Sequence, residues 1–492
     1  MFEAAEAGSK ISRDEADELL LQLRVDLINA QYDLREADFP VLIVLMGDDR
    51  PGVSGLVNRL NEWMDGRYIR THVFGAPTDE ELQRPRDWRY WLALPAHGQL
   101  AIYTGAFALE TILERLQGAI DRPELDRRLR HMRRLEQSLR DDGALVLKFW
   151  IHLPRKTFKK RIKQSRKKGG GRLDATDHLI FDAYDDLMPL AEYVLRKTDP
   201  GGAPWHIVEG TQARYRDITV ARIIRSALTE RLSRPPAPAA AASAPPAPTV
   251  APEATVLDAV DLDATLTRPE YRATRNALQA RLRMLTRRAR EAGISSVVVF
   301  EGWDAAGKGG VIRRITQAMD VQDYRVVPIG APTDEELAHH YLWRFWRQLP
   351  RAGRMVIFDR SWYGRVLVER VEGLVPEIAW QRAYTEIDDF EEQIAERGIP
   401  LFKFWLHMDR EEQIRRFRAR ERTPYKKYKI TNEDYRNRER WGAYRTAVND
   451  MVQRTSTQFA PWTLVPANDK RFARVKVLRT ICTGLAKGLD EG

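Results

Sequence analysis

The chain has 492 residues, 43% of them apolar and 30% charged, and this composition predicts a globular protein of two domains with roughly 200 residues or more each. Its formal net charge of +10 indicates an anionic partner, a class that includes nucleic acid, phospholipid surfaces, nucleotides and polymeric phosphate. The single cysteine, Cys482, excludes an intramolecular disulfide framework and the usual thiolate zinc sites.

The N-terminal segment, MFEAAEAGSKISRDEADELL, is acidic and has neither the basic nor the apolar region of a secretory signal. No stretch of the sequence approaches the about 18 consecutive apolar residues that a membrane-spanning helix needs. Together with the lone cysteine, which suits a reducing compartment, these features predict a cytoplasmic protein without a membrane partner.

The two halves of the sequence resemble each other. The octapeptide GAPTDEEL occurs at 75–82 and again at 330–337, an offset of 255 residues. The same offset pairs the Lys-Phe-Trp triplet at 148–150 with the one at 403–405, without a gap. The sequence therefore predicts a tandem duplication, in which each copy serves as a control for the other.

A segment rich in proline and alanine separates the copies. Residues 234–253, RPPAPAAAASAPPAPTVAPE, carry almost no charge and no large apolar side chain. Long loops without structure are uncommon within compact domains, so this composition favours a semi-extended spacer over a surface loop. We expect one domain over 1–232, a linker over 233–256 and a second domain over 257–492.

Short apolar runs in the second copy alternate with longer helical patterns. The expected strands lie at 295–300, 324–329, 354–359, 400–407 and 462–466. Repeated strand–helix units predict an α/β fold, in which each domain has a parallel sheet of about five strands flanked by helices. Ligands of such sheets bind at the carboxyl ends of the strands.

Directly after the first of these strands, residues 302–310 read GWDAAGKGG and have the Gly-x4-Gly-Lys spacing of a phosphate-binding loop. Apolar residues then recur at helical spacing, which predicts a helix that starts at the loop and includes Val311, Ile312, Ile315, Ala318 and Met319. This context favours a phosphate site over a glycine-rich turn with a surface lysine. The predicted phosphate-binding residues are Gly302, Ala305, Ala306, Gly307, Lys308, Gly309 and Gly310.

Two carboxylates are expected beside that phosphate. Gly309 stands where such loops usually carry the Ser or Thr that binds magnesium, and Asp304 is the predicted replacement because a hard cation accepts a carboxylate oxygen. Asp359 ends the apolar strand MVIFD, where a second magnesium ligand is typical, although an aspartate there can also serve as a helix cap or turn residue. The loop upstream favours the metal role, so Asp304 and Asp359 are the predicted Mg²⁺ ligands.

A basic segment follows the fourth expected strand. Residues 410–440 contain twelve Arg or Lys against six Asp or Glu, and Pro424 interrupts their helical pattern. Such a run is often a solvated helix face, but many phosphate-transferring enzymes carry an arginine-rich lid at this place. So much positive charge exceeds what a mononucleotide requires and favours a polyanion.

The strand with GWDAAGKGG, the GAPTDEEL segment, the sequence FDRSWYGR at 358–365 and the basic segment together resemble the type-2 polyphosphate kinase family. The two fused copies are similar to its polyphosphate:AMP phosphotransferase subgroup. The resemblance extends from about residue 260 to the C-terminus and, more weakly, over the first copy. It implies a P-loop kinase fold with a basic helical lid, and Mg²⁺-dependent in-line transfer of the terminal phosphoryl of inorganic polyphosphate to AMP.

This resemblance also implies roles for single residues. The catalytic residues would be Asp304, Lys308, Asp359, Arg360, Arg416 and Arg420. Arg365 and Lys429 would bind phosphate or nucleotide. Direct transfer requires positioning and charge neutralisation without a covalent intermediate, so His407 is expected to be structural. The acceptor (AMP, or ADP or GDP), the length of the polyphosphate and any homo-oligomer stay open.

The first copy lacks much of this chemistry. At the offset of 255, Lys308 becomes Val53 and Asp359 becomes Thr104, whereas Asp304 is kept as Asp49. We expect this copy to be non-catalytic. Its basic segment at 155–168 either grips polyphosphate or belongs to a scaffold, and the sequence leaves both open.

Two competing functions are an ATP-dependent nucleotide kinase and a nucleic-acid-binding protein. The second draws on an aromatic group near arginines, made of Tyr341, Trp343, Phe345 and Trp346. The first copy keeps similar aromatic residues where its phosphate site is lost, which favours core packing. The predicted partners are therefore inorganic polyphosphate and AMP, without nucleic acid.

Overall fold

The structure is a computed structural model that describes residues 1–167, 173–199, 202–234, 255–424 and 432–491. The chain divides into two compact units. Unit 1 comprises Met1–Pro77, Ala93–Pro236 and Asp334–His340, and unit 2 comprises Thr78–Leu92, Ala237–Thr333 and Tyr341–Gly492. The linker expected over 233–256 falls mainly outside the described residues, so the domain boundaries stay a prediction.

The first copy contains a parallel sheet of five strands in the order β2-β3-β1-β4-β5. The strands are β1 (Val41–Gly47), β2 (Ile69–Val73), β3 (Leu100–Thr104), β4 (Leu145–His152) and β5 (Trp205–Glu209). Its helices are α1 (Arg13–Leu34), α2 (Arg50–Trp63), α3 (Asp79–Leu82), α4 (Trp88–Leu92), α5 (Ala108–Leu116), α6 (Arg122–Asp141), α7 (Arg155–Lys167), α8 (Ala175–Asp182), α9 (Tyr184–Lys197) and α10 (Ala213–Ser233), with 3-10 turns η1 (Glu3–Glu6) and η2 (Gly66–Tyr68).

The second copy repeats this topology in a parallel sheet of order β10-β9-β6-β8-β7. Its strands are β6 (Ser296–Gly302), β7 (Tyr324–Pro328), β8 (Met355–Asp359), β9 (Leu401–His407) and β10 (Trp462–Pro466). The helices are α11 (Arg268–Glu291), α12 (Lys308–Thr316), α13 (Asp334–Leu337), α14 (Trp343–Trp346), α15 (Val368–Val371), α16 (Glu377–Glu396), α17 (Arg410–Glu421), α18 (Asn432–Glu439), α19 (Trp441–Thr455) and α20 (Lys470–Glu491), with 3-10 turns η3 (Val256–Ala259) and η4 (Trp362–Val366).

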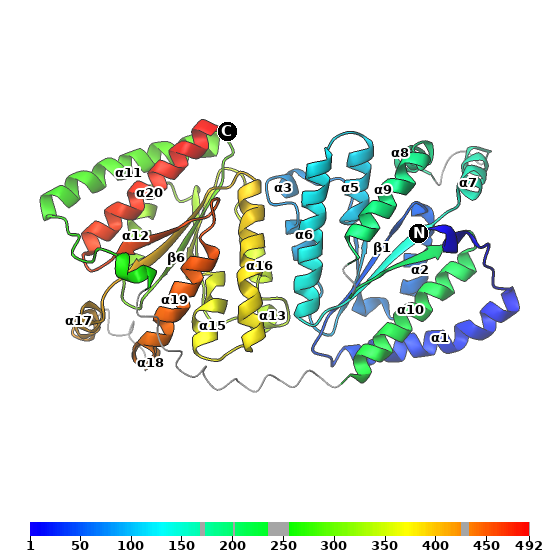
Figure 1. Ribbon diagram of the computed structural model, residues 1–492, viewed down its shortest axis with the longest axis horizontal. Coiled ribbons are helices and arrows are strands. Elements are labelled where there is room, and N and C mark those ends of the chain that lie inside the picture. Colours follow the sequence, from blue (N-terminus) through cyan, green and yellow to red (C-terminus); the bar gives the residue numbers. More distant parts are fainter. Residues whose placement is uncertain (168–172, 200–201, 235–254, 425–431, 492) are drawn as a thin grey trace. The chain divides into compact units, whose positions relative to one another are not determined.

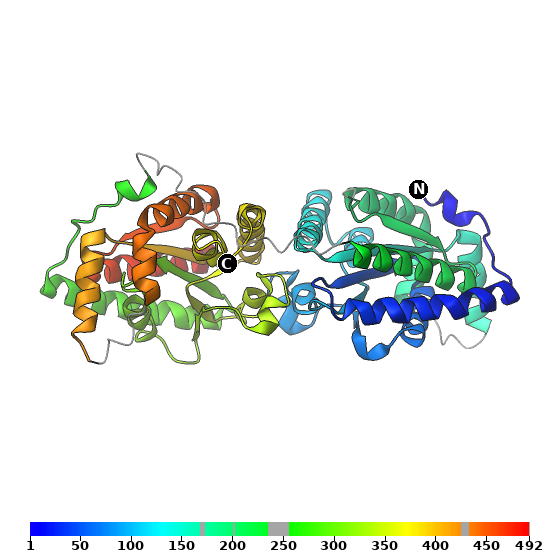
Figure 2. The ribbon, with the colours of Figure 1, turned by 90° about the horizontal axis from the view of Figure 1, so that it is seen from below.

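Helices cover both faces of each sheet (Figures 1 and 2). In the second copy, α11 packs against α20 on one side of the sheet, and α16 packs against α19 on the other. Because both faces are covered, the strands are apolar runs, and Val297, Val298, Val299 and Phe300 of β6 are fully buried. The predicted fold class and all five predicted strands are confirmed.

The helix after the loop is shorter than expected, because α12 ends at Thr316. Ala318 and Met319 are buried, but they lie in the turn after the helix. The predicted core packing of the aromatic group is confirmed for Trp343, Phe345 and Trp346, which are buried.

Within the described residues, no helix combines the length and the apolar composition needed to cross a bilayer. The predicted cytoplasmic location stays a prediction.

Candidate active site

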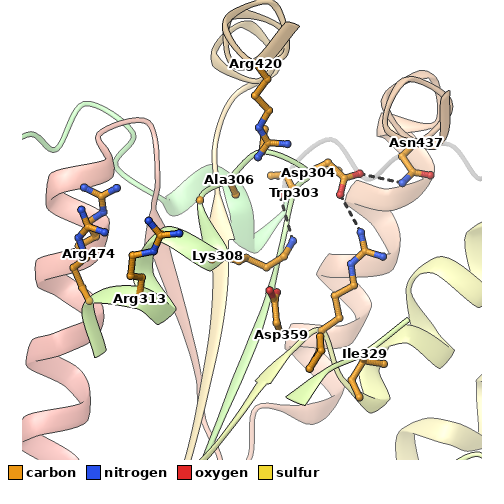
Figure 3. Close-up of a pocket in the computed structure, with 17 residues that line it drawn as sticks. Trp303, Asp304, Ala306, Lys308, Arg313, Ile329, Asp359, Arg420, Asn437 and Arg474 are labelled. Carbon is orange, nitrogen blue, oxygen red and sulfur yellow. Dashed lines mark hydrogen bonds and ion pairs between the residues drawn. The ribbon is translucent and has the colours of Figure 1, made fainter. Parts of the chain in front are cut away.

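A cavity of about 720 Å³ opens at the carboxyl ends of β6 and β8 in the second copy. The central position of β6, between β8 and β9, places the loop at 302–310 beside the end of β8, which carries Asp359. Loop residues from Trp303 to Gly310 line the cavity together with Asp359, Arg360 and Arg420. Most of the predicted site residues therefore meet in one place (Figure 3).

The glycines of the loop have different tasks. Gly302 has φ +147°, and a Cβ there would lie 2.7 Å from the carbonyl oxygen of Leu406. Gly302 therefore allows close packing of β6 on β9. It does not line the 720 Å³ cavity, in contrast to its predicted contact with phosphate. Gly307, with φ +109°, precedes α12 and directs the first turn of that helix toward the cavity.

Lys308 and Asp359 lie next to each other at the base of the cavity. The Lys308 ammonium donates to the carbonyl oxygen of Gly302 at 2.7 Å, and the Asp359 carboxylate points toward this ammonium (Figure 3). Lys308 is thus held at the end of β6, with its charge facing the space that the loop encloses. A cation at this place is suited to neutralise a phosphate.

Asp304 faces the same cavity from the loop. Its carboxylate accepts a hydrogen bond from Asn437 of α18 at 3.0 Å and lies 3.4 Å from Arg360 (Figure 3). The carbonyl oxygen of Asp304 accepts from Gln413 of α17 at 3.2 Å. Both helices of the basic segment therefore contact this residue, and a carboxylate pair, Asp304 and Asp359, lines one cavity as expected for hard-cation ligands.

Arg360 adopts a left-handed backbone conformation, with φ +67°. The residue at the same position of the first copy is Gly105, with φ +70°. A non-glycine residue in this conformation is strained by roughly 1 kcal/mol or more. The second copy retains this strain while placing a guanidinium in the cavity, which favours a functional role for Arg360.

Buried carboxylates anchor the turn that carries Arg360. The Ser361 hydroxyl donates to Glu301 at 2.8 Å, and the Trp362 indole and Tyr363 hydroxyl donate to Glu391 at 3.0 and 2.6 Å. In the first copy Ala106, Phe107 and Ala108 replace the three donors, and Met46 replaces Glu301. The anchors are thus specific to the copy that carries Arg360.

Glu301 is a functional candidate that the sequence reasoning missed. Burial raises its pKa to about 7, although Lys308, Ser361 and Arg360 act in the opposite direction. A raised carboxyl pKa means that the folded protein binds this proton more tightly than the unfolded chain. The contribution of Glu301 to the free energy of unfolding therefore falls as the pH rises from about 4.5 to about 7.

We expect Glu301→Gln to become more stable relative to the natural protein as the pH is raised from about 5 to about 8. Glutamine keeps an acceptor for Ser361 but cannot ionise, so it avoids the buried charge. Thermal melting of both proteins at the two pH values measures the effect. An equal difference in melting temperature at both pH values would contradict the assignment.

In the described part of the basic segment, one of the two predicted arginines reaches the cavity. Arg420 of α17 enters the cavity (Figure 3). Arg365 does not line it, because η4 turns this side chain toward Glu369, 2.9 Å away, and places it over the Tyr341 ring. Lys429 lies outside the described residues, so its predicted role stays a prediction.

Arg416 also differs from its predicted role. Its buried guanidinium donates to Glu412 and to four backbone carbonyl oxygens, those of Ala305, Ala306, Ala467 and Asn468. Through these hydrogen bonds, Arg416 connects α17 to the phosphate-binding loop and to the segment after β10. It holds the loop in position and does not line the cavity.

Three arginines that the sequence reasoning passed over line another side of the cavity: Arg313 and Arg314 on α12, and Arg474 on α20. Figure 3 shows Arg313 and Arg474 away from Asn437. The signal that points to Arg474 is its place just after the fifth strand, since segments after parallel strands surround the site. The cavity thus has a strongly cationic wall.

Trp303 joins the loop to the end of the basic segment. Its ring stacks on Trp441 of α19, with centroids 3.8 Å apart and planes 8° apart, and its indole donates to Nδ1 of His407 at 3.0 Å. Burial lowers the pKa of His407 to about 4, with Arg445 acting in the same direction, so the ring is neutral and accepts this bond. This geometry supports the structural role expected for His407.

Sequence comparison agrees with this site. The family model for Polyphosphate kinase 2 (PPK2) matches residues 10–235 and again residues 265–490. The chain belongs to the polyphosphate kinase 2 family. Each copy carries one match, which confirms the predicted duplication and the predicted family.

Several relatives of this polyphosphate kinase 2 chain align over almost its whole length. A polyphosphate:AMP phosphotransferase of Pseudomonas aeruginosa is 48% identical over 98% of this chain and 98% of its own. One from Acinetobacter johnsonii is 35% identical over 95% and 97%. A crystal structure from Pseudomonas aeruginosa PA01, described as a polyphosphate kinase 2, superposes with a TM-score of 0.90 at 46% identity and covers 100% of both chains.

The first polyphosphate kinase 2 copy fills its own loop with ion pairs. Asp49 accepts from the Gly52 amide at 3.0 Å and from Arg161 of α7 at 2.6 Å, and Arg216 of α10 lies 4.0 Å away. A carboxylate of the chain therefore engages the amide and arginines that would otherwise face a phosphate. This arrangement supports the prediction that the first copy is not catalytic.

Arg161 is the counterpart of Arg416, at the offset of 255. It too joins the loop to the segment after the last strand, through Asp49 and the carbonyl oxygen of Gly210 at 2.8 Å. An arginine that is kept in a copy without Lys308 and Asp359 has a task other than transfer. This internal comparison supports the positioning role of Arg416.

We expect Arg416→Ala to lower the free energy of unfolding by about 3 kcal/mol, since four carbonyl groups and Glu412 lose a buried cation. ADP formation falls as well, because the loop is no longer held. Arg161→Ala is the matched control, which lowers the melting temperature without changing kcat. Equal kcat in both variants would contradict the role given to Arg416.

Proposed function

We propose that the second copy transfers the terminal phosphoryl group of inorganic polyphosphate to AMP and produces ADP. The observation that carries this proposal is a single cavity in which Lys308, Asp304, Asp359 and a cationic wall meet. The proposal is supported by full-length relatives named polyphosphate:AMP phosphotransferase. An excess of cations over two carboxylates suits a donor that is itself a chain of phosphates.

The protein acts by positioning and charge neutralisation. Amides at the start of α12 and Lys308 hold phosphate oxygens at the transfer point, and Arg360 and Arg420 neutralise charge that develops on the transferring group. Donor and acceptor phosphates are brought into line, so the transfer needs no side-chain nucleophile. The engagement of His407 with Trp303 supports this direct route.

A divalent cation belongs to this chemistry, and we propose Mg²⁺. The donor set fits, because Asp304 and Asp359 offer carboxylate oxygens to one cavity and Mg²⁺ favours oxygen ligands. Such an ion would supply positive charge that reduces the repulsion between the phosphates of donor and acceptor. Asp304 is held for this purpose by Asn437, and Asp359 by the end of β8.

A smaller recess of about 70 Å³ adjoins the transfer point, and we propose that its lining contacts the nucleobase of AMP. Lys308, Asp304 and Arg360 border this cavity as well as the larger one, so an acceptor phosphate there would meet the donor. Its remaining lining is more apolar and includes Leu367, Val368, Trp405 and Tyr444. Apolar and aromatic groups of this kind suit a nucleobase.

The test is an acceptor panel with polyphosphate as the sole donor. AMP, ADP, GMP and GDP are each incubated with the full chain, long-chain polyphosphate and Mg²⁺, without ATP. We expect ADP from AMP. Turnover with ATP but not with polyphosphate would favour an ATP-dependent kinase, and salt-sensitive RNA binding without turnover would favour a nucleic-acid-binding protein.

A further inference from the structure

Tyr271 on α11 is a buried polar side chain without a partner. Only 7% of its surface is exposed, and its hydroxyl forms no hydrogen bond of regular geometry among the described residues. The Nε atom of Arg314, on α12, is likewise buried without a partner in this part of the chain. Buried polar groups are nearly always satisfied, so these two atoms call for a ligand.

Three guanidinium groups surround this tyrosine. Arg275 lies 5.4 Å from the ring centroid, and Arg314 and Arg474 approach from α12 and α20. Burial opposes ionisation of the Tyr271 hydroxyl, but Arg314, Arg474 and Arg275 together lower its pKa. Within the described residues, no Asp or Glu forms an ion pair with these three arginines. The cluster is therefore cationic and lacks a compensating anion.

In the first copy, acidic residues neutralise the corresponding arginines. Its Arg59 stands at the position of Arg314, and the guanidinium of Arg216 lies over Gly55 as that of Arg474 lies over Gly310. Arg59 pairs with Glu62 at 2.7 Å, and Arg216 pairs with Asp217 at 2.6 Å.

The second copy replaces both of these acids. Gln317 stands at the position of Glu62, and when β5 is aligned with β10, Arg474 itself stands at the position of Asp217. Ala16 and Leu20 of the first copy stand at the positions of Tyr271 and Arg275. The cluster is thus built only where the transfer site is intact, and its internal anions have been removed.

The cluster adjoins the transfer point but is separate from it. Arg314 follows Lys308 by six residues on α12, which corresponds to about 9 Å along the helix. Arg314 and Arg474 also line the 720 Å³ cavity. One extended anion could therefore contact the loop and the cluster at once, and guanidinium groups match phosphate oxygens in geometry and charge.

We propose that Tyr271, Arg275, Arg314 and Arg474 form a distal subsite for a non-reacting phosphoryl group of the donor chain. The identity of the anion rests on the proposed function. Two attachment points on one chain raise the affinity for a ligand long enough to reach both. The enzyme accordingly prefers long polyphosphate to chains that fill only the loop.

The test is calorimetric titration of the full chain with long-chain polyphosphate and with tripolyphosphate, in the absence of AMP. We expect Arg275→Ala to weaken binding of the long chain about tenfold, as for loss of one charge-assisted hydrogen bond. Tyr271→Phe weakens it severalfold. Arg272→Ala is the matched control, because it removes an exposed cation of the same helix, and it leaves binding within about twofold. Tripolyphosphate binds all variants alike.

Two results would overturn the subsite: unchanged binding of the long chain by Arg275→Ala and Tyr271→Phe, or an equal loss in Arg272→Ala. A separate titration with AMP alone gives a further outcome. If the variants bind AMP more weakly and polyphosphate normally, the cluster belongs to the nucleotide site and the proposed subsite is wrong. Because binding is read without turnover, the proposed function can fail separately. If the natural protein forms no ADP but Arg275→Ala still weakens binding of the long chain, the subsite is supported and the proposed transfer is refuted.

Discussion

Replacement of Lys308 by alanine is expected to lower kcat for ADP formation by roughly a hundredfold or more. The ammonium is held at the end of β6 by the carbonyl oxygen of Gly302, beside Asp359, where it faces the phosphate space. No other lysine lines this cavity in the described residues. Steady-state assay with AMP, Mg²⁺ and polyphosphate measures the loss, and circular dichroism checks that the variant is folded.

The first copy supplies the control for this variant. Adding Val53→Lys to Lys308→Ala restores nothing, because Thr104 replaces the strand-end aspartate and Arg161 already engages Asp49. Ordinary turnover by Lys308→Ala would show that the transfer site has been misplaced. Recovery of activity in the double variant would show that the first copy can act as a catalyst.

The second large effect concerns Arg360, for which we expect stability and activity to change in opposite directions. Arg360→Gly relieves a left-handed conformation of φ +67° and raises the free energy of unfolding by about 1 kcal/mol. The same change removes a guanidinium that lines the cavity next to Asp304, and it lowers kcat by roughly a hundredfold. Thermal melting and the ADP assay measure the two effects.

Gly105→Ala is the matched control at the equivalent position. Its φ is +70°, and the added Cβ would lie 2.4 Å from the carbonyl oxygen of Phe74, so the melting temperature falls while kcat stays the same. A less stable Arg360→Gly protein would contradict the strain that we infer. Unchanged kcat in that variant would remove Arg360 from the transfer site.

Local patterns were enough to predict the fold and the centre of the site. Apolar runs located the strands, because strands buried on both faces read as continuous apolar sequence. The glycine spacing and the aspartate at the end of MVIFD located Lys308 and Asp359, since the loop and the strand end are single segments of chain. The carboxyl ends of neighbouring parallel strands then brought them together.

The roles of the arginines could not be read in the same way. A charge-dense helix does not reveal which side chain faces inward, and α17 directs Arg416 to the loop carbonyls but Arg420 to the cavity. The sequence did hold one signal for the role of Arg416. The first copy has Val53 in place of Lys308 but keeps an arginine, Arg161, at the position of Arg416. Arg314 and Arg474 depend on the packing of α12 against α20, which joins segments far apart in the sequence.

Glu301 and Trp303 were missed for another reason. Both lie beside the recognised loop, but their roles depend on Ser361 and Trp441, which other parts of the chain supply. The comparison of the two copies is the signal that could have found Glu301, since Glu301 and Ser361 are replaced together by Met46 and Ala106.

The most direct test of the central claim compares the full chain with Asp359→Asn, using AMP, long-chain polyphosphate and Mg²⁺ in the absence of ATP. We expect the natural protein to form one ADP for each phosphoryl group lost from the polyphosphate, and Asp359→Asn to fall to background while its melting temperature stays close to that of the natural protein. ADP formation at an undiminished rate by Asp359→Asn, or turnover of the natural protein only when ATP replaces polyphosphate, would contradict the account.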